Sequence, residues 1–367
     1  MIACSVRAPG GQGQTPASGE SADTGMAIRQ RRPFPGHTLR SSLFRFRRVR
    51  TEGGRDGKGG ALTTVAVCVA TLYRPLGLAA LLASLGEMTV PDGVAVKVVV
   101  VDNDADGSAR AVVDALAATK PVPVHYAIQP VRGIPFARNR AVEEAGEVDW
   151  IAFVDDDEVV DPGWLAELLR VAAQHSADVV TGTVLPMFEQ APPRWADKGG
   201  FFERRRFPTG HRIQFARTSN ALVAGKLLVG VTQPFSEAFR NNGGDDTHFF
   251  QRVRLSGHVI VWADDAVVQE TVPVSRVNST WLIKREYRRG NTLSLCLRDL
   301  EDSWGRRAKR VLAAGWHAAN GTLALLATPV QGRVALIRGA QRLAFAGGLM
   351  SGLTGRIYQE YSVVHGR

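Results

Sequence analysis

The most constraining feature of this sequence is a regular alternation of short apolar runs with longer segments of helical spacing between residues 62 and 184. The apolar runs are rich in valine and nearly continuous, as expected for strands that are buried on both faces. We expect strands at 65–70, 94–103, 122–128, 150–155 and 177–184. We expect helices at 75–88, 107–119, 137–146 and 162–175. This order predicts an α/β fold with a mostly parallel sheet and helices on both faces.

The pattern is less regular after residue 185. Residues 186–212 are rich in proline, arginine and aromatic side chains, which predicts a long loop or lid. Two further strands are expected at 220–225 and 258–264, and a helix at 245–257. A strongly basic helix is predicted at 279–298.

Charge is distributed unevenly along the chain. Residues 1–60 carry a net charge of +7 and residues 281–367 carry +9, whereas residues 61–280 carry −6. A nucleic-acid-binding fold usually has its basic surface on the folded domain, so no nucleic-acid partner is expected. Basic ends suit attraction to an anionic membrane surface. The alternative is a solvated tail beside an ordinary basic helical region.

Two Ala/Leu-rich stretches near the end, 311–327 and 335–350, are separated by TPVQGR (328–333). A membrane-spanning helix needs about 20 predominantly apolar residues. The first stretch is shorter and contains His317 and Asn320, and the second contains two arginines. We therefore predict interfacial or domain-packed helices rather than spans.

These patterns divide the chain into three parts. Residues 1–60 are poor in apolar side chains and are predicted to be a disordered basic extension. Residues 61–275 are predicted to form the α/β domain, and residues 276–367 a helical region that associates with a membrane if its helices are interfacial rather than domain-packed. The three widely spaced cysteines fit a reducing compartment, and the first twenty residues lack the apolar segment of a signal peptide. The expected location is the cytoplasm, peripheral at the inner face of the plasma membrane.

An acidic run, Asp155 to Glu158, directly follows the fourth strand. Adjacent carboxylates raise one another's pKa unless a cation lies between them. Asp155 and Asp157 are candidate ligands for Mg²⁺ or Mn²⁺ bound with a diphosphate, because these hard cations prefer oxygen ligands. The alternative is an acidic turn before the next helix, for which Asp161 is the predicted N-cap.

Other polar loops follow neighbouring strands and should meet at the same sheet edge. Asp102 and Asp104 could accept hydrogen bonds from a nucleobase or ribose, or form a helix-capping turn. Arg132, Arg138 and Asn139 follow the third strand. Arginine suits bidentate phosphate contacts, and salt bridges to the acidic loops are the alternative.

Two later features could complete a site. GGDD (243–246) places carboxylates at a helix N-terminus, where one could act as a base if burial compensates the helix dipole. Simple N-capping by Asp245 is the alternative. Arg288 and Arg289 could contact a diphosphate, or form a solvated helix face.

Six motifs in order carry a resemblance: VCVATLYRP, VVVDND, VRGIPFARN, AFVDDDEVVDPGWL, GGDDTHFF and REYRRGNT. Over about residues 62–300 the chain resembles the family 2 glycosyltransferases of the GT-A fold, and within them the succinoglycan-type bacterial branch. The resemblance implies inverting transfer of a sugar from a nucleotide diphosphate sugar, with UDP as the favoured nucleotide. The implied acceptor is a saccharide or a lipid-linked molecule in cell-surface polysaccharide synthesis.

The resemblance also implies roles for individual residues. Asp155 and Asp157 match the motif for the metal and diphosphate. Asp246 matches the aspartate that deprotonates the acceptor hydroxyl, with Asp245 in place of the usual glutamate, so the choice between these two stays open. The residues assigned to the nucleotide sugar, or to the loops that hold it, are Thr71, Arg74, Asp102, Asp104, Arg132, Arg138, Asn139, Asp155, Asp156, Arg288 and Arg289.

The sequence departs from the family pattern in places. The late motif lacks the Gln and Trp of processive synthases, which points to a single addition. Gln269 and Glu270 lie where many relatives carry a histidine, so a third metal ligand is open. Two other functions were weighed: nucleotidyl transfer, which usually needs a Gly-rich basic loop where TLYRP stands, and an inactive membrane-bound scaffold. Retention of Asp155, Asp157 and Asp246 argues against the scaffold.

Overall fold

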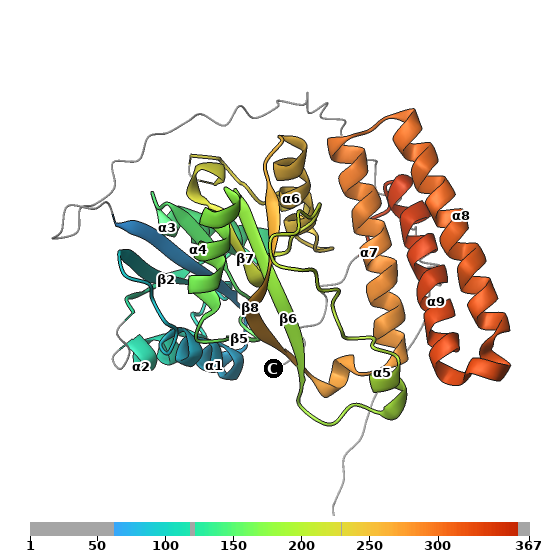
Figure 1. Ribbon diagram of the computed structural model, residues 1–367, viewed down its shortest axis with the longest axis horizontal. Helices are drawn as coiled ribbons and strands as arrows, with labels where there is room; N and C mark the ends of the chain where they lie inside the picture. The colour runs from blue at the N-terminus through green and yellow to red at the C-terminus, as the bar shows by residue number, and fades with distance from the viewer. Residues whose placement is uncertain (1–61, 118–121, 229, 359–367) are drawn as a thin grey trace, which may run out of the picture. The chain divides into compact units, whose positions relative to one another are not determined.

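A computed structural model describes residues 62–117, 122–228 and 230–358, and the predicted extension 1–60 lies outside them. In this part of the chain eight strands form one sheet in the order β3-β2-β1-β4-β7-β6-β8-β5 (Figure 1). The strands are β1 Thr63–Thr71, β2 Val94–Asp102, β3 Val124–Ile128, β4 Trp150–Phe153, β5 Glu158–Val160, β6 Val179–Phe188, β7 Ala221–Ala224 and β8 Ile260–Val272. The helices are α1 Pro75–Leu85, α2 Arg110–Ala117, α3 Ile134–Ala145, α4 Trp164–His175, α5 Arg194–Lys198, α6 Asp245–Leu255, α7 Ser279–Leu300, α8 Trp304–Leu326 and α9 Thr328–Leu353.

The sheet is mixed. Its first half, β3-β2-β1-β4, is parallel throughout, and β6 also pairs with β8 in parallel. The antiparallel pairs are β4 with β7, β7 with β6, and β8 with β5. The carboxyl ends of β1, β2, β3 and β4 therefore lie along one edge, as predicted for the polar loops that follow them.

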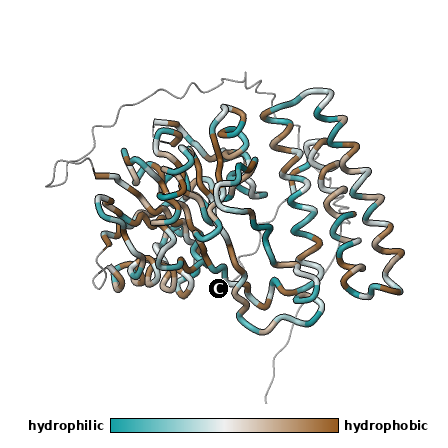
Figure 2. The backbone as a smooth tube through the Cα atoms, in the orientation of Figure 1, coloured by the Kyte–Doolittle hydropathy of each residue, from teal (hydrophilic) through white to brown (hydrophobic). Residues whose placement is uncertain are grey.

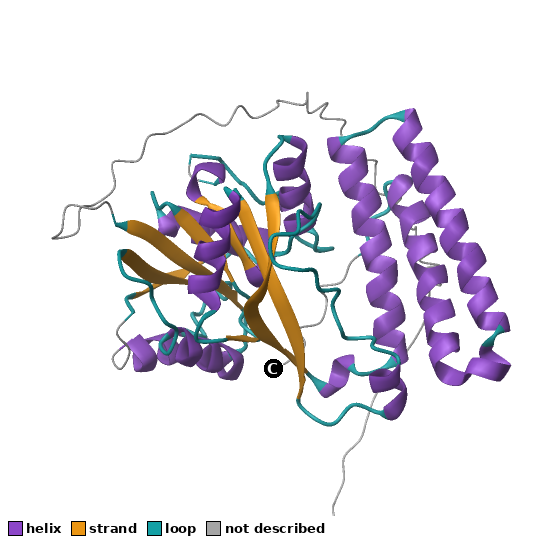
Figure 3. Cartoon of the chain, viewed as in Figure 1, coloured by secondary structure: helices purple, strands orange, loops and turns teal. Residues whose placement is uncertain are grey.

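Helices lie on both faces of the sheet (Figure 3). A hydrophobic core on each face packs the strands against these helices. Side chains alternate between the two faces of a strand. In β1, Val65, Val67 and Val69 pack in the core that contains α1, α2 and α4. Ala66 and Cys68 pack in the core that contains α3 and α6. Burying each large apolar side chain contributes about 1.5–3 kcal/mol. The predicted α/β fold with helices on both faces is confirmed.

The predicted N-cap role of Asp161 is wrong. Helix α4 begins at Trp164, its N-cap is Gly163, and no side chain caps it. Asp161 follows the short strand β5, which the sequence did not reveal, and its N–H donates to the carbonyl of Val267 on β8 (3.1 Å). Its Oδ1 accepts a weak hydrogen bond from Gln269 (3.4 Å). Pairing with β8 therefore turns this carboxylate away from the helix.

Strands β6 and β8 are longer than predicted because they pair with each other as far as Phe188 and Val272, across an irregularity after Gly182. Residues 186–212 are thus only partly a loop, since they also contain α5. The loop is fastened to β8. Arg206 donates to both carboxylate oxygens of Asp264 (2.9 and 2.8 Å), and Arg204 forms an ion pair with Glu270.

Helix α9 packs against both α7 and α8. Glycines allow these backbones to come close. A Cβ added at Gly348 would lie 2.0 Å from the carbonyl oxygen of Tyr287, and one at Gly339 would lie 2.8 Å from that of Gly321. The predicted break at 328–333 is seen as a left-handed Gly332 (φ +67°) inside α9. No described helix combines the length and apolarity that crossing a bilayer requires.

Candidate active site

Asp156 joins the carboxyl ends of β1 and β4. Thr71 Oγ1 donates to Asp156 Oδ2 (2.8 Å) and Arg74 Nη1 donates to its Oδ1 (2.8 Å). The same Nη1 lies 3.0 Å from Asp157 Oδ2. Asp156 is 5% exposed, whereas the neighbouring Asp155 side chain is 41% exposed. The acidic run is paired with a cation, Arg74, which lies in the loop between β1 and α1.

Arg138 joins the first acidic motif to the second. Its Nη1 donates to Asp245 Oδ2 (2.7 Å) and its Nη2 lies 3.4 Å from Asp155 Oδ1. The side chain of Asp245 is 2% exposed and that of Arg138 is 12% exposed. One arginine on α3 thus holds the end of β4 and the start of α6 together.

The two aspartates of GGDD have different environments. Burial raises the pKa of Asp245 and the neighbouring Asp246 adds to this, while Arg138 opposes it. Asp246 is half-buried, and its Oδ1 accepts from the backbone N–H of Thr247 (2.5 Å). Its Oδ2 accepts no hydrogen bond from any described residue. Asp245 is committed to the protein, whereas Asp246 keeps an oxygen available.

Glu158 and Glu270 form a second acidic layer, opposite each other on β5 and β8. Glu158 is buried, and its Oε2 accepts from the N–H of Asp155 (2.8 Å). Its Oε1 is buried and has no hydrogen-bond partner in the part of the chain that the structure describes. Burial raises the pKa of Glu158, and the charges of Asp155 and Glu270 add to it. The sequence did not single out Glu158, because its burial depends on the unpredicted pairing of β5.

The acidic layer also contains arginines that sequence reasoning missed. Arg276 Nη1 lies 3.6 Å from Asp157 Oδ2 and 3.5 Å from Glu270 Oε1. Burial raises the pKa of Asp157 to about 7, with Asp156 adding to the shift and Arg74 opposing it. Within the described ranges, no three His, Cys, Asp or Glu side chains converge as a ready-made metal site.

Asp102 is fully buried, and its carboxylate is occupied by the protein. Its Oδ2 accepts from the N–H of Ala109 (2.7 Å) and from the Tyr126 hydroxyl (2.9 Å), and its Oδ1 accepts from the N–H of Asp104 (3.1 Å). This is the capping turn that the sequence left open as an alternative. Asp104 in turn accepts from the hydroxyl of Tyr73 (3.1 Å).

Arg132 and Asn139 support neighbouring loops. The Arg132 guanidinium lies over the ring of Tyr73, 5.2 Å from its centroid. The Asn139 side chain donates to the carbonyl of Phe235 and accepts from its N–H, both at 2.9 Å. Asn139 therefore fixes the loop that contains Phe235.

The late basic motif lies on α7. Arg289 is exposed, forms an ion pair with Glu286 (3.0 Å) and lies over the ring of Phe345. Arg285, one turn earlier, donates to the carbonyl of Phe201 (2.8 Å), and burial lowers its pKa to about 10. Arg288 is half-buried. The motif REYRRGNT contains both Arg285 and Arg289. Only the orientation of α7 shows that the Arg285 side chain is more buried than that of Arg289.

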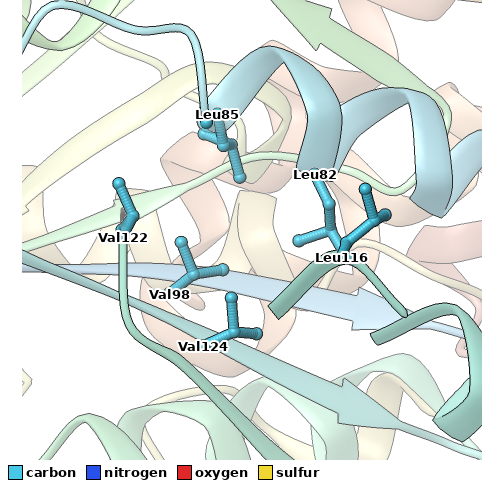
Figure 4. A pocket seen from close by; sticks show the side chains of 7 residues that line it. Leu82, Leu85, Val98, Leu116, Val122 and Val124 are labelled. Atoms are coloured by element: carbon cyan, nitrogen blue, oxygen red, sulfur yellow. The ribbon is translucent and has the colours of Figure 1, made fainter. Parts of the chain in front are cut away.

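An apolar pocket beneath α1 is separate from this polar cluster (Figure 4). Its labelled side chains are Leu82, Leu85, Val98, Leu116, Val122 and Val124. It has no polar side chain that could do chemistry, and it is a gap in the core. A second small pocket is lined by residues that include Arg138, Asp155 and Thr218, and it lies within the candidate site.

Comparison with known proteins identifies the family. The model of the family "Glycosyl transferase family 2" matches residues 66–228. Succinoglycan biosynthesis protein ExoM of Rhizobium meliloti (strain 1021) is 33% identical over 291 residues, which is 79% of this chain and 92% of that protein. The chain belongs to glycosyl transferase family 2. The predicted resemblance is confirmed, and this glycosyltransferase is an enzyme of the class expected from its motifs.

A solved structure supports the fold of this glycosyltransferase. The mannosyltransferase PcManGT from Pyrobaculum calidifontis, in complex with GDP-Man and Mn²⁺, matches with a TM-score of 0.54 and 18% identity, over 85% of this chain and 92% of that one. TarS 1–349 of S. aureus matches with a TM-score of 0.48 and 16% identity, over 83% and 95% of the two chains. The first match supports the GT-A fold.

Proposed function

We propose that this glycosyltransferase moves a sugar, with inversion, from a nucleotide diphosphate sugar to a saccharide or lipid-linked acceptor of a cell-surface polysaccharide. UDP is the nucleotide we favour. The relative from Rhizobium meliloti is named for succinoglycan biosynthesis, and PcManGT was solved with GDP-Man and Mn²⁺. Family membership favours glycosyl transfer over nucleotidyl transfer. The domain division at 61–275 and 276–367 remains part of this proposal.

The observation that carries the proposal is the bridge made by Arg138. It brings Asp155, which matches the family's diphosphate motif, and the GGDD turn, which matches its base motif, to one place. Inverting transfer needs a base on one side of the anomeric carbon and a stabilised leaving group on the other. The bridge puts the residues for both tasks within one cluster.

Asp246 is the proposed base. Its unoccupied Oδ2 can accept the proton of the acceptor hydroxyl as that oxygen attacks the anomeric carbon and the bond to the nucleoside diphosphate breaks. Asp245 positions Arg138 and does not itself take the proton. Arg74, Arg138, Arg288 and Arg289 are the proposed cations for the negative charge that develops on the departing diphosphate.

The residues present fit a divalent metal. Asp155 and Asp157 offer carboxylate oxygens of the kind that Mg²⁺ and Mn²⁺ prefer, and the donor's diphosphate would complete the ligand set. The buried Oε1 of Glu158, which has no hydrogen-bond partner among the described residues, is a further oxygen acceptor beside them. When bound, the metal would neutralise charge on the diphosphate.

The test is Asp246→Asn, an isosteric change that removes the base. We expect transfer to fall by about a hundredfold or more, the usual contribution of a general base, while calorimetry shows unchanged binding of a UDP-sugar with Mn²⁺. Asp114→Asn, an exposed aspartate on α2, is the control and should retain full activity. Wild-type turnover in Asp246→Asn would refute the base assignment. Absence of binding by any UDP- or GDP-sugar would favour the inactive scaffold.

A further inference from the structure

Helix α8 has an apolar face that no described element covers. The residues Leu312, Trp316, Ala319, Leu323, Leu326 and Val330, here called the α8 stripe, recur at intervals of three and four. This spacing places them on one side of a helix and its continuation into α9. Trp316 is 70% exposed, Leu326 72% and Val330 91%. Figure 2 shows apolar residues recurring along this outer helix.

The stripe is not an edge of the core. The buried residues of α8 are Ala314 and Gly321, which lie on the opposite side of the helix, where it packs on α9. Helices of soluble proteins usually turn such a stripe inward. Here α8 has both an inward face of small residues and an outward row of large ones. Contiguous exposed apolar patches of this kind mark contact surfaces.

The charge around the α8 stripe indicates which kind of surface it contacts. Residues 303–358 contain eight Lys/Arg and no Asp/Glu. Four of these cations, at positions 306, 307, 309 and 310, lie in the first two turns of α8, just before the stripe begins at Leu312. Arg306 and Arg307 form ion pairs with Glu301 and Asp302, just before the helix, and Lys309 is exposed.

We propose that the α8 stripe lies in the interface of a lipid bilayer whose headgroups are anionic, with the helix parallel to the membrane plane. An amphipathic helix with large apolar side chains on one face and flanking cations binds in this way. A second copy of the chain fits the surface less well. It would bring the same positive charge against itself without acidic residues in α8 or α9 to match it.

The test is flotation of the full chain with vesicles. Wild-type protein should float with phosphatidylcholine vesicles that contain phosphatidylglycerol, and should float less at high salt. Trp316→Gln combined with Leu323→Gln should lower the fraction bound by about tenfold or more, because two large apolar side chains no longer enter the interface. Both side chains are exposed, so folding should be retained; circular dichroism and UDP-sugar binding check this.

Leu76→Gln on α1 is the matched control, since this leucine is 86% exposed but lies outside the stripe. Its flotation should equal that of the wild type. Equal binding of wild type and the double variant overturns the proposal. So does equal binding of wild type to pure phosphatidylcholine vesicles, which would remove the role of charge. A wild-type dimer that the double variant converts to a monomer, without vesicle binding by either, would assign the stripe to a second copy.

Discussion

Arg138 on α3 donates a 2.7 Å hydrogen bond to Asp245, the first residue of α6, and both side chains are almost entirely buried. The same guanidinium reaches Asp155 at the end of β4 (3.4 Å). The sequence left a salt bridge to the acidic loops open for Arg138, as the alternative to a phosphate contact, but it did not say which carboxylates Arg138 would join. The finding makes Arg138 the link on which the relative placement of the two acidic motifs depends.

Arg138→Ala should therefore destabilise the protein strongly. Removing one member of a buried ion pair leaves the other charge without compensation and costs about 3–5 kcal/mol. The free energy of unfolding in urea measures this. Arg140→Ala, which breaks partly exposed ion pairs with Glu143 and Glu144 on the same helix, should cost about 1 kcal/mol or less. If the two variants have the same free energy of unfolding, the buried bridge stabilises the protein no more than the ion pairs of Arg140 do. Adding Asp245→Asn to Arg138→Ala should restore part of the loss.

Gly244→Ala tests the turn that presents Asp246. Gly244 is left-handed (φ +99°), and an added Cβ would lie 2.1 Å from Thr292 Cγ2, so the start of α6 must move. We expect transfer activity to fall by about tenfold or more, because small displacements of catalytic groups are costly. Gly257→Ala, at the other end of α6, has φ +84° but no atom within 4 Å of the new Cβ. It should cost about 1–2 kcal/mol of stability and leave turnover intact. Equal turnover losses in the two variants would contradict the role of the Gly244 turn.

Thr71→Val tests the link between β1 and Asp156. The change keeps the side-chain shape but removes the hydroxyl that donates to Asp156 Oδ2 (2.8 Å), which should cost about 1–3 kcal/mol because an acceptor is left buried. Donor binding, measured by calorimetry with a UDP-sugar and Mn²⁺, should weaken. Thr64→Val is a matched control on the same strand, since its hydroxyl donates to Asp149 (2.9 Å) at the opposite end of β1. A similar stability loss with unchanged donor affinity is expected there.

The sequence predicted the parallel half of the sheet well because each strand–helix pair has a local signal. The valine runs of β1 and β2 are buried on both faces. A strand buried on both faces has a nearly continuous apolar sequence, which can be recognised without the structure. The short strand β5 has no such signal. It exists because Glu158, Val159 and Val160 pair with β8, which lies far along the chain. Missing that strand also produced the wrong N-cap at Asp161.

The sequence predicted which loops form the candidate site, but not which side chains contact one another within it. Topology brings Thr71, Asp156 and Asp245 to one edge, as the strand order implied. Which arginine meets which carboxylate depends on side-chain direction, and periodicity does not encode it. Arg276 was therefore missed as a member of the cluster, and the more enclosed Arg285 was not distinguished from Arg288 and Arg289 within its motif.

The ion pair between Arg206 and Asp264 gives a pH prediction for the loop that contains Arg206. The Arg206 hydrogen bonds lower the pKa of Asp264 from 3.8 to about 2, with Trp262 and Thr183 contributing. A carboxyl whose folded-state pKa is depressed adds stability above its unfolded pKa and loses that stability as pH falls toward the folded value. The contribution of this ion pair to the free energy of unfolding is therefore complete above about pH 5 and declines between about pH 4 and 2.

Asp264→Asn should lower the urea midpoint by a constant amount from pH 7 to 5, and the difference in urea midpoint from wild type should narrow from pH 4 to 3. Asp265→Asn, the exposed neighbour, should leave the midpoint near the wild-type value at every pH. A gap for Asp264→Asn that stays constant down to pH 3 would show that the charge of Asp264 does not hold the loop.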